Sequence, residues 1–270
     1  MGRVIVALSG GKASAWCADW TFRHYPKEDV VLYFNDTKWE DPDLYRFLDD
    51  LRGYFNHPIT YDADGRSPEE VFYDQRALAN NRMPFCSRVL KAERLQRYCQ
   101  PGDTLVFGIG CTEKHRAVRI AQIYHALKPN LTLRFPLLET FGSRERERES
   151  INNFLLQANI QEPALYALGF THNNCGGGCV RAGKKQWKRL YEMRPEVYLE
   201  RERVEREVSE HLGKRVTFFK DESLEEFRQR IESGTLSAYY LRPDVEQLTL
   251  QLDDERNDAM ECIGICGTMN

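Results

Sequence analysis

The sequence predicts an α/β protein with a doubly wound, mostly parallel sheet, followed by a helical C-terminal region that contains cysteines. Short uninterrupted apolar runs recur along the first half of the chain, and segments with helical spacing of apolar residues separate them. Apolar residues make up 41% and charged residues 29% of the 270 residues. This composition is typical of globular proteins, and it excludes a disordered or fibrous chain.

Four apolar runs are predicted strands, because each is short and ends at glycine or polar residues. They cover residues 4–8, 30–34, 59–61 and 104–108. Runs that are apolar along their whole length indicate parallel strands with helices on both faces. The predicted helices include residues 13–18, a segment after Pro42, and residues 68–79, 88–98 and 114–127.

The chain changes character near Ser143, where we place a domain boundary. Residues 1–142 form the predicted core with the strands, and residues 143–270 form a helical region with a cysteine-rich loop and a C-terminal tail. The charge run at residues 144–149 opens a predicted helix. Residues 200–210 carry many charges of both signs, which predicts a solvent-exposed helix without a binding role.

The net charge of −3 argues against a surface built to coat nucleic acid. A basic helical face at Lys184, Lys185 and Arg189 is most simply a solvated surface, with a phosphate or RNA contact as the less favoured alternative. No stretch approaches 18 apolar residues, and the N-terminus lacks the layout of a signal peptide. We therefore expect a cytoplasmic protein without a membrane partner.

The loop after the first strand is predicted to bind a pyrophosphate group. It contains Ser9, Gly10, Gly11 and Lys12 and leads directly into a helix. The free N–H groups and the dipole of a helix N-terminus both favour an anion there. Lys12 adds a positive charge, and the hydroxyl groups of Ser9 and Ser14 add hydrogen-bond donors. The spacing differs from the Walker pattern of kinases and GTPases.

Two further segments are expected beside this loop. Asp36 follows the second predicted strand and Gly108 ends the fourth, and ligands of doubly wound sheets bind beyond the carboxyl ends of the strands. Three motifs then follow in order along the chain. They are N-D-T-K-W-E-D-P at residues 35–42, F-C-S-R-V-L-K at 85–91 and G-I-G-C-T-E-K-H-R at 108–116.

With the loop and these motifs in this order, the chain resembles the PP-loop superfamily of adenine nucleotide alpha-hydrolases, in the branch of phosphoadenosine phosphosulfate (PAPS) reductase. The resemblance covers about residues 3–190. It implies that Asp36 and Thr37 lie near the adenosine. It also implies that Cys86 and Lys91 correspond to the C-x-x-x-x-K segment of the family, with Lys91 among the nucleotide-binding residues.

The resemblance implies further roles in the segment after the fourth strand. Glu113 and Arg116 match the E-x-x-R pattern of the family, in which the arginine neutralises charge that develops on the α-phosphate. Gly108 and Glu113 are thereby assigned to the nucleotide site. Two positions depart from the family: Ala13 replaces an Asp associated with the loop or its metal, and Lys38 replaces the glycine of a D-T-G motif.

The eight cysteines point to metal binding or thiol chemistry, because the cytosol disfavours disulfides. Cys175 and Cys179 enclose three glycines, and Cys262 and Cys266 share the same spacing. Glycines allow the backbone to wrap closely around a bound atom. Four thiolates suit a tetrahedral Zn²⁺ site or an iron–sulfur cluster.

The resemblance offers another grouping, because iron–sulfur members of the family have a ligand at the position of Cys86. Cys86 would then join Cys175 and Cys179. Cys262 would be free as a thiolate nucleophile, since Glu261-Cys262 is similar to the start of the E-C-G segment of PAPS reductases. Both groupings stay open. We expect Cys17 and Cys99 to be packing residues, and we assign no role to Cys111. His172 is expected to be structural, with a metal ligand or a phosphate donor as the alternative.

These features favour an enzyme that binds ATP or a PAPS-like adenosine phosphate and cleaves it at the α-phosphate, in substrate adenylation or sulfur transfer. The catalytic residues expected are Lys12, Arg116 and Cys262, and Mg²⁺ would add charge neutralisation. The first alternative is a thiol-dependent sulfonucleotide reductase with a thioredoxin-like partner or sulfur donor. The second is an inactive nucleotide-binding or zinc-binding module, which the presence of Ala13 suggests.

Overall fold

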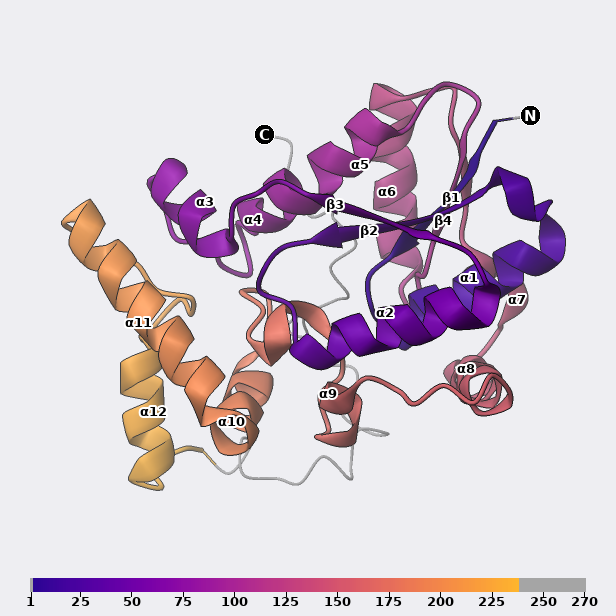
Figure 1. Cartoon of the computed structure of the whole chain (residues 1–270). Coiled ribbons are helices and arrows are strands. Elements are labelled where there is room, and N and C mark those ends of the chain that lie inside the picture. Colours follow the sequence, from indigo (N-terminus) through magenta and orange to yellow (C-terminus); the bar gives the residue numbers. More distant parts are fainter. Residues whose placement is uncertain (1, 238–270) are drawn as a thin grey trace.

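The computed structural model describes residues 2–237 of the chain. Within them lies an all-parallel sheet of five strands in the order β3-β2-β1-β4-β5 (Figure 1). The predicted α/β class with a parallel sheet is confirmed, and the last strand is one that the sequence did not predict. The strands are β1 (Val4–Leu8), β2 (Val30–Asp36), β3 (Ile59–Ala63), β4 (Thr104–Phe107) and β5 (Thr132–Arg134).

The order of the strands reverses at β1, which pairs with β2 on one side and with β4 on the other. Val6 of β1 lies opposite Leu32 and Val106 in these two pairings. A reversal of this kind leaves a crevice beyond the carboxyl ends of the strands, where ligands of open α/β sheets bind. Ser9, Asp36 and Gly108 all lie at this edge of the sheet.

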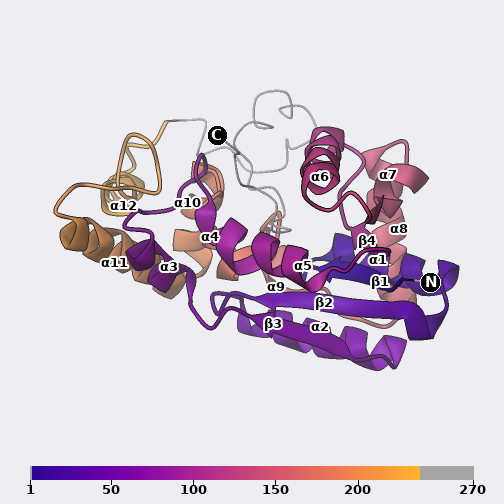
Figure 2. The same cartoon turned by 90° about the horizontal axis from the view of Figure 1, so that it is seen from above.

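Helices cover both faces of the sheet. Phe34, Phe47 and Phe154 belong to the core on one face, whereas Tyr33, Leu95 and other residues form the core on the opposite face. Figure 2 shows α2 and α5 on opposite sides. The first face carries α1 (Lys12–His24), α2 (Pro42–Phe55), α7 (Pro136–Thr140) and α8 (Arg144–Gln157), and the second carries α5 (Glu93–Tyr98) and α6 (Lys114–Leu127).

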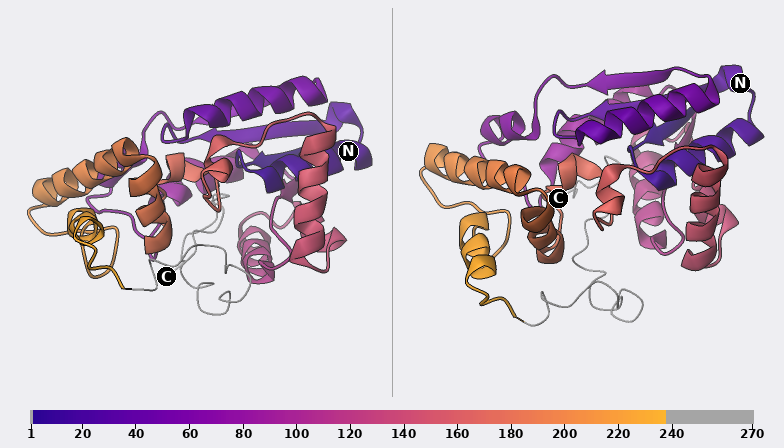
Figure 3. Two further views of the ribbon diagram at one scale, coloured as in Figure 1. Left: turned by 90° about the horizontal axis from the view of Figure 1, so that it is seen from below. Right: turned by 60° about the horizontal axis from the view of Figure 1, so that its bottom comes forward.

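A second group of helices gathers at one end of the sheet, as the orange and yellow ribbons in Figure 3 show. Trp187 and Tyr198 are fully buried in its core. This core includes α3 (Pro68–Asp74), α4 (Phe85–Ser87), the π-helical segment η2 (Arg88–Ala92), α9 (Ala164–Ala167), α10 (Lys184–Met193), α11 (Pro195–Leu212) and α12 (Leu224–Glu232). Two short 3-10 segments, η1 (Lys27–Asp29) and η3 (Asn174–Gly177), complete the described helices.

The sheet core and the core of the helical group each contain residues from before and from after Ser143. Helix α8 follows Ser143 but packs into the sheet core through Ile151 and Phe154. Helix α3 precedes it but packs with the helical group through Val71 and Phe72. The domain boundary near Ser143 stays a prediction, and hydrophobic packing does not divide there.

Two helix predictions need correction. The helix predicted at residues 68–79 ends at Asp74, because Arg76 adopts a left-handed conformation with φ of 51°. The helix predicted at residues 88–98 is confirmed, and it opens with a π-helical turn. The helix over residues 200–210 is not uniformly solvated, since Arg201 and Glu205 are buried. Glu205 accepts the backbone N–H groups of the loop and helix that follow, at 2.7 and 2.6 Å.

Candidate functional site

The loop after β1 is held in shape by its own residues. Gly10 has φ of +78°, and a Cβ there would lie 2.4 Å from Leu44 Cδ1, so only glycine fits. The hydroxyls of Ser9 and Ser14 lie 3.1 Å apart, and Ser14 Oγ donates to the Gly11 carbonyl at 2.9 Å. Gly11 is the N-cap of α1 and offers no side-chain acceptor. The first N–H groups of α1 therefore lack a capping side chain.

Lys12 has a partner that the sequence did not reveal. Its Nζ lies 2.6 Å from Glu162 Oε2 and 4.5 Å from the centroid of the Tyr166 ring. Both partners come from the segment around the start of α9, about 150 residues along the chain. An anion that binds Lys12 must compete with the Glu162 carboxylate.

The end of β4 packs closely against the same loop. A Cβ on Gly108 would lie 2.8 Å from the backbone nitrogen of Ser14, so this position also requires glycine. Beyond it, Arg116 forms an ion pair with Glu113, and Arg116 is buried. The structure thus brings together the two residues of the E-x-x-R pattern.

Cys111 lies in this segment but is not exposed as a reactive thiol. Its backbone N–H donates to Glu147 Oε2 at 2.5 Å. Burial and the Glu147 carboxylate raise the pKa of the Cys111 thiol to about 11. Cys17 and Cys99 are buried in the two sheet cores, as predicted for packing residues.

The end of β2 keeps the backbone geometry of a glycine-containing turn. Asp36 Oδ1 accepts hydrogen bonds from Tyr45 Oη at 2.9 Å and from the backbone N–H of Lys38 at 2.8 Å. Lys38 has φ of 62°, in the left-handed region that favours glycine. The departure from the D-T-G pattern therefore changes the side chain while the backbone still takes a conformation that glycine prefers.

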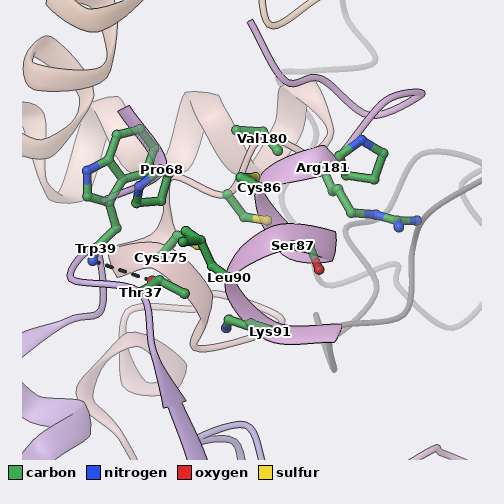
Figure 4. Close-up of a pocket in the computed structure, with 12 residues that line it drawn as sticks. Thr37, Trp39, Pro68, Cys86, Ser87, Leu90, Lys91, Cys175, Val180 and Arg181 are labelled. Atoms are coloured by element: carbon green, nitrogen blue, oxygen red, sulfur yellow. Dashed lines mark hydrogen bonds between the residues drawn. The ribbon is translucent and has the colours of Figure 1, made fainter. Parts of the chain in front are cut away.

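Three of the candidate metal ligands line one cavity. Figure 4 shows Cys86, which comes from α4, and Cys175, which comes from the loop around η3. Cys179 comes from the same loop and lines the same cavity. Thr37 and Lys91 border the same cavity. Residues 172–179 are called here the cysteine loop. The structure therefore brings the cysteine loop against the end of β2.

The two cysteines of this loop contact each other. A hydrogen bond with Cys179, together with burial, raises the pKa of the Cys175 thiol well above its ordinary value. Among residues 2–237, no group of three His, Cys, Asp or Glu side chains converges closely enough to hold a metal ion. The thiols thus fit part of a ligand set, and Cys262 and Cys266 lie outside the described residues.

A second cavity lies at the ends of β1 and β2. Ser9, Asn35 and Lys91 border it, with apolar residues and Tyr33 forming the rest of its wall. Lys91 borders both cavities and pairs with Glu40 at 3.2 Å. The π-helical turn of η2 carries this lysine, and such turns are frequent at functional sites.

Glycines of the cysteine loop make room for neighbouring side chains. A Cβ on Gly177 would lie 2.7 Å from the Phe170 ring, and one on Gly178 would lie 3.2 Å from Arg201 Cγ. The Arg201 guanidinium lies 3.5 Å from the centroid of the Trp39 ring. Burial lowers the pKa of Arg201 to about 10. The loop thus packs against a buried cation in a segment whose charge pattern predicts a solvated helix.

The basic face on α10 is largely engaged within the protein. Lys184 pairs with Asp221 at 3.0 Å and also with Glu222. Arg189 donates to the carbonyl of Gly169. Lys184 and Arg189 are thus committed to contacts within the protein, so the face is less solvated than predicted.

Comparisons with protein-family models, curated proteins and solved structures gave no match. The resemblance to the PP-loop superfamily therefore stays a prediction from the motifs. None of the helices described within residues 2–237 has the length and apolar character needed to cross a membrane.

Proposed function

We propose that the protein is an adenine-nucleotide enzyme that binds ATP or a PAPS-like adenosine phosphate at the carboxyl edge of its sheet and cleaves it at the α-phosphate. The geometry of the Ser9–Ser14 loop carries this proposal: a glycine turn with φ of +78° leads into a helix without a capping side chain. Such an N-terminus stabilises a pyrophosphate. Substrate adenylation and sulfur transfer both use this cleavage.

The chemistry follows from where charge develops. Loop N–H groups and Lys12 would hold the leaving pyrophosphate, and Arg116 would neutralise the α-phosphate. Gly108 supports this arrangement because it lets β4 approach the loop closely. Mg²⁺, when bound, would supply further charge neutralisation.

Variants of the paired residues Lys12 and Glu162 test the proposed phosphate site, because one should lower ATP affinity and the other should raise it. Lys12→Ala should weaken ATP binding by about 1–3 kcal/mol, the scale of a charge-assisted hydrogen bond. Glu162→Gln should tighten it by about 0.2–1 kcal/mol, because a partly exposed ion pair no longer competes. Isothermal titration with ATP and with PAPS measures both, and Lys188→Ala, which breaks a remote Lys–Glu pair on α10, is the control. Equal affinities in all variants would remove the phosphate-site assignment.

A thiol-dependent sulfonucleotide reductase is the second candidate, favoured by the three cysteines beside Lys91. It would need a thioredoxin-like reductant and a thiolate nucleophile. The raised pKa of Cys175 argues against this residue as that nucleophile, and Cys262 stays the candidate. Products separate the two: the first enzyme releases pyrophosphate or AMP from ATP, and the reductase releases sulfite from PAPS. Binding without either product would indicate an inactive module.

We also propose that Cys86, Cys175 and Cys179 are ligands of an iron–sulfur cluster or Zn²⁺, with Cys262 and Cys266 as candidates for the remaining positions. Iron and zinc analysis with absorbance spectra after anaerobic purification tests this. Serine variants of the ligands should lose metal, whereas Cys99→Ser, a buried packing position, should retain it. Wild-type protein with neither metal would end the proposal.

A further inference from the structure

The carboxylate of Glu40 lies where three segments remote in sequence meet. Its Oε1 accepts hydrogen bonds from Thr37 Oγ1 at 2.9 Å and from Lys91 Nζ at 3.2 Å. Its Oε2 accepts the backbone N–H of Cys175 at 3.0 Å. The Glu40 side chain has 0% exposed surface, and a buried carboxylate is stable only with its oxygens bonded. These donors therefore fix its position.

The donors come from different parts of the candidate site. Thr37 follows the end of β2, and Lys91 borders both cavities. Cys175 opens the pair of cysteines in the cysteine loop. Glu40 is thus a direct physical connection between the sheet edge, where the phosphates of a nucleotide would lie, and the cysteines.

The connection ends at a strained residue. Cys175 has φ of 53°, a left-handed conformation that costs a non-glycine residue about 1–2 kcal/mol. The backbone N–H of Cys175 is also the group that donates a hydrogen bond to Glu40. Loss of the Glu40 carboxylate would remove a bond that holds the loop in its strained conformation.

We propose that Glu40 is a positioning residue that transmits occupancy of the nucleotide site to the cysteine loop. The proposal rests on the proposed function, because the signal is a phosphate anion. A phosphate that draws Lys91 toward itself leaves Glu40 with fewer donors. Its carboxylate then accepts the Cys175 N–H more strongly, and the loop is held more firmly.

Hydrogen exchange measured by mass spectrometry on the full chain tests this contact directly. Saturating Mg²⁺–ATP should slow exchange in peptides covering residues 9–15 and 172–179 of the wild-type protein. The expected effect in the cysteine loop is about tenfold, which corresponds to about 1.4 kcal/mol. In Glu40→Gln, exchange in the cysteine loop should already be faster without nucleotide, and ATP should slow only the peptides covering residues 9–15.

Glu205→Gln is the matched control, because Glu205 is also a buried carboxylate that accepts backbone N–H groups. It should speed exchange around residues 217–225 and leave the cysteine loop as in the wild type. Glu40→Asp keeps the charge beside Lys91 but is one methylene shorter. If Glu40→Gln folds poorly, Glu40→Asp should show the same fast exchange in the cysteine loop.

Two results would overturn the proposal. One is an ATP effect on the cysteine loop that is the same in the wild type and in Glu40→Gln. The other is nucleotide-free exchange in that loop that does not respond to either Glu40 variant. Absence of any ATP effect at residues 9–15 of the wild type would instead refute the proposed function and the coupling together, while the nucleotide-free comparison still decides whether Glu40 positions the loop.

Discussion

The loop at residues 9–14, called here the phosphate loop after its proposed ligand, and the cysteine loop at residues 172–179 are both rich in glycine, yet they are stabilised differently. In the phosphate loop, Ser9 and Ser14 satisfy each other and the neighbouring backbone. The cysteine loop is buried, but within residues 2–237 three of its side-chain atoms have no hydrogen-bond partner. These are His172 Nε2, Asn173 Oδ1 and Asn174 Nδ2.

The two loops differ in how far along the chain the partners of their hydrogen bonds lie. The hydrogen bonds of Ser9 and Ser14 close within five residues, so these two residues shape the turn locally. Lys12 and the Gly10 carbonyl of the same loop have remote partners, Glu162 and Asn173. The cysteine loop depends on Glu40, 135 residues away, and on the Gly10 carbonyl, which accepts from Asn173 Nδ2 across 163 residues. Preorganisation lowers the cost of binding. A loop whose polar atoms lack partners is the more sensitive of the two to what lies beside it.

The largest expected effect comes from Gly10→Ala in the phosphate loop. A left-handed alanine costs about 1–2 kcal/mol and the clash with Leu44 adds about 1–3 kcal/mol, so unfolding free energy should fall by about 2–5 kcal/mol. Gly53→Ala in α2 is the control, because a Cβ there meets no atom within 4 Å. It should stabilise by about 0.5–1 kcal/mol. Urea denaturation of both variants measures this, and similar values for the two would contradict the preformed loop.

The sequence predicted the local features well and the remote ones poorly. Four strands and the glycine turn after the first of them follow from apolar runs and glycines, which are properties of adjacent residues. The strand Thr132–Arg134 was missed because it is three residues long and lacks a continuous apolar run. Glu162 and Glu40 were missed because each meets its partner only after folding, and a lone glutamate carries no sequence signal.

The burial of charged side chains also could not be predicted from the sequence patterns. Arg201 lies in a stretch of alternating charges that predicts a solvated helix, yet Gly178 and Trp39 enclose its side chain. The described residues include only three of the five cysteines that the sequence predicts as metal ligands. Cys86, Cys175 and Cys179 share a cavity, whereas Cys262 and Cys266 lie outside the described residues.

An intermediate effect is expected from His172 in the cysteine loop. Burial, with a smaller contribution from the charge of Lys91, lowers the pKa of His172 to about 4. The unfolded chain takes up this proton near pH 6.5 and the folded protein does not. The stability contributed by the neutral ring is therefore complete above pH 6.5 and falls by about 3 kcal/mol as the pH drops to 4.

His172→Gln should remove this part of the pH dependence, because glutamine does not titrate. Thermal or urea denaturation between pH 7 and pH 4 measures the wild type and the variant, and their difference cancels the titration of the carboxylates. The two curves should converge as the pH falls. Curves that stay parallel would show that His172 titrates equally in the folded and unfolded chains, and the cysteine loop would then be open to water.

The smallest effect is expected at Lys38, a non-glycine residue with positive φ in the turn after β2. Lys38→Gly removes a left-handed cost of about 1–2 kcal/mol and adds a backbone entropy cost of about 0.5–1 kcal/mol. Stability should therefore rise by about 0.5–1 kcal/mol. The Lys38 ammonium donates to the Gly65 carbonyl, so ATP affinity should change little. Arg76→Gly, at an exposed position with φ of 51°, is the matched control and should shift stability in the same direction. Denaturation together with isothermal titration decides the matter: a large loss of ATP affinity in Lys38→Gly alone would mean that the lysine side chain, rather than the backbone turn, shapes the nucleotide site.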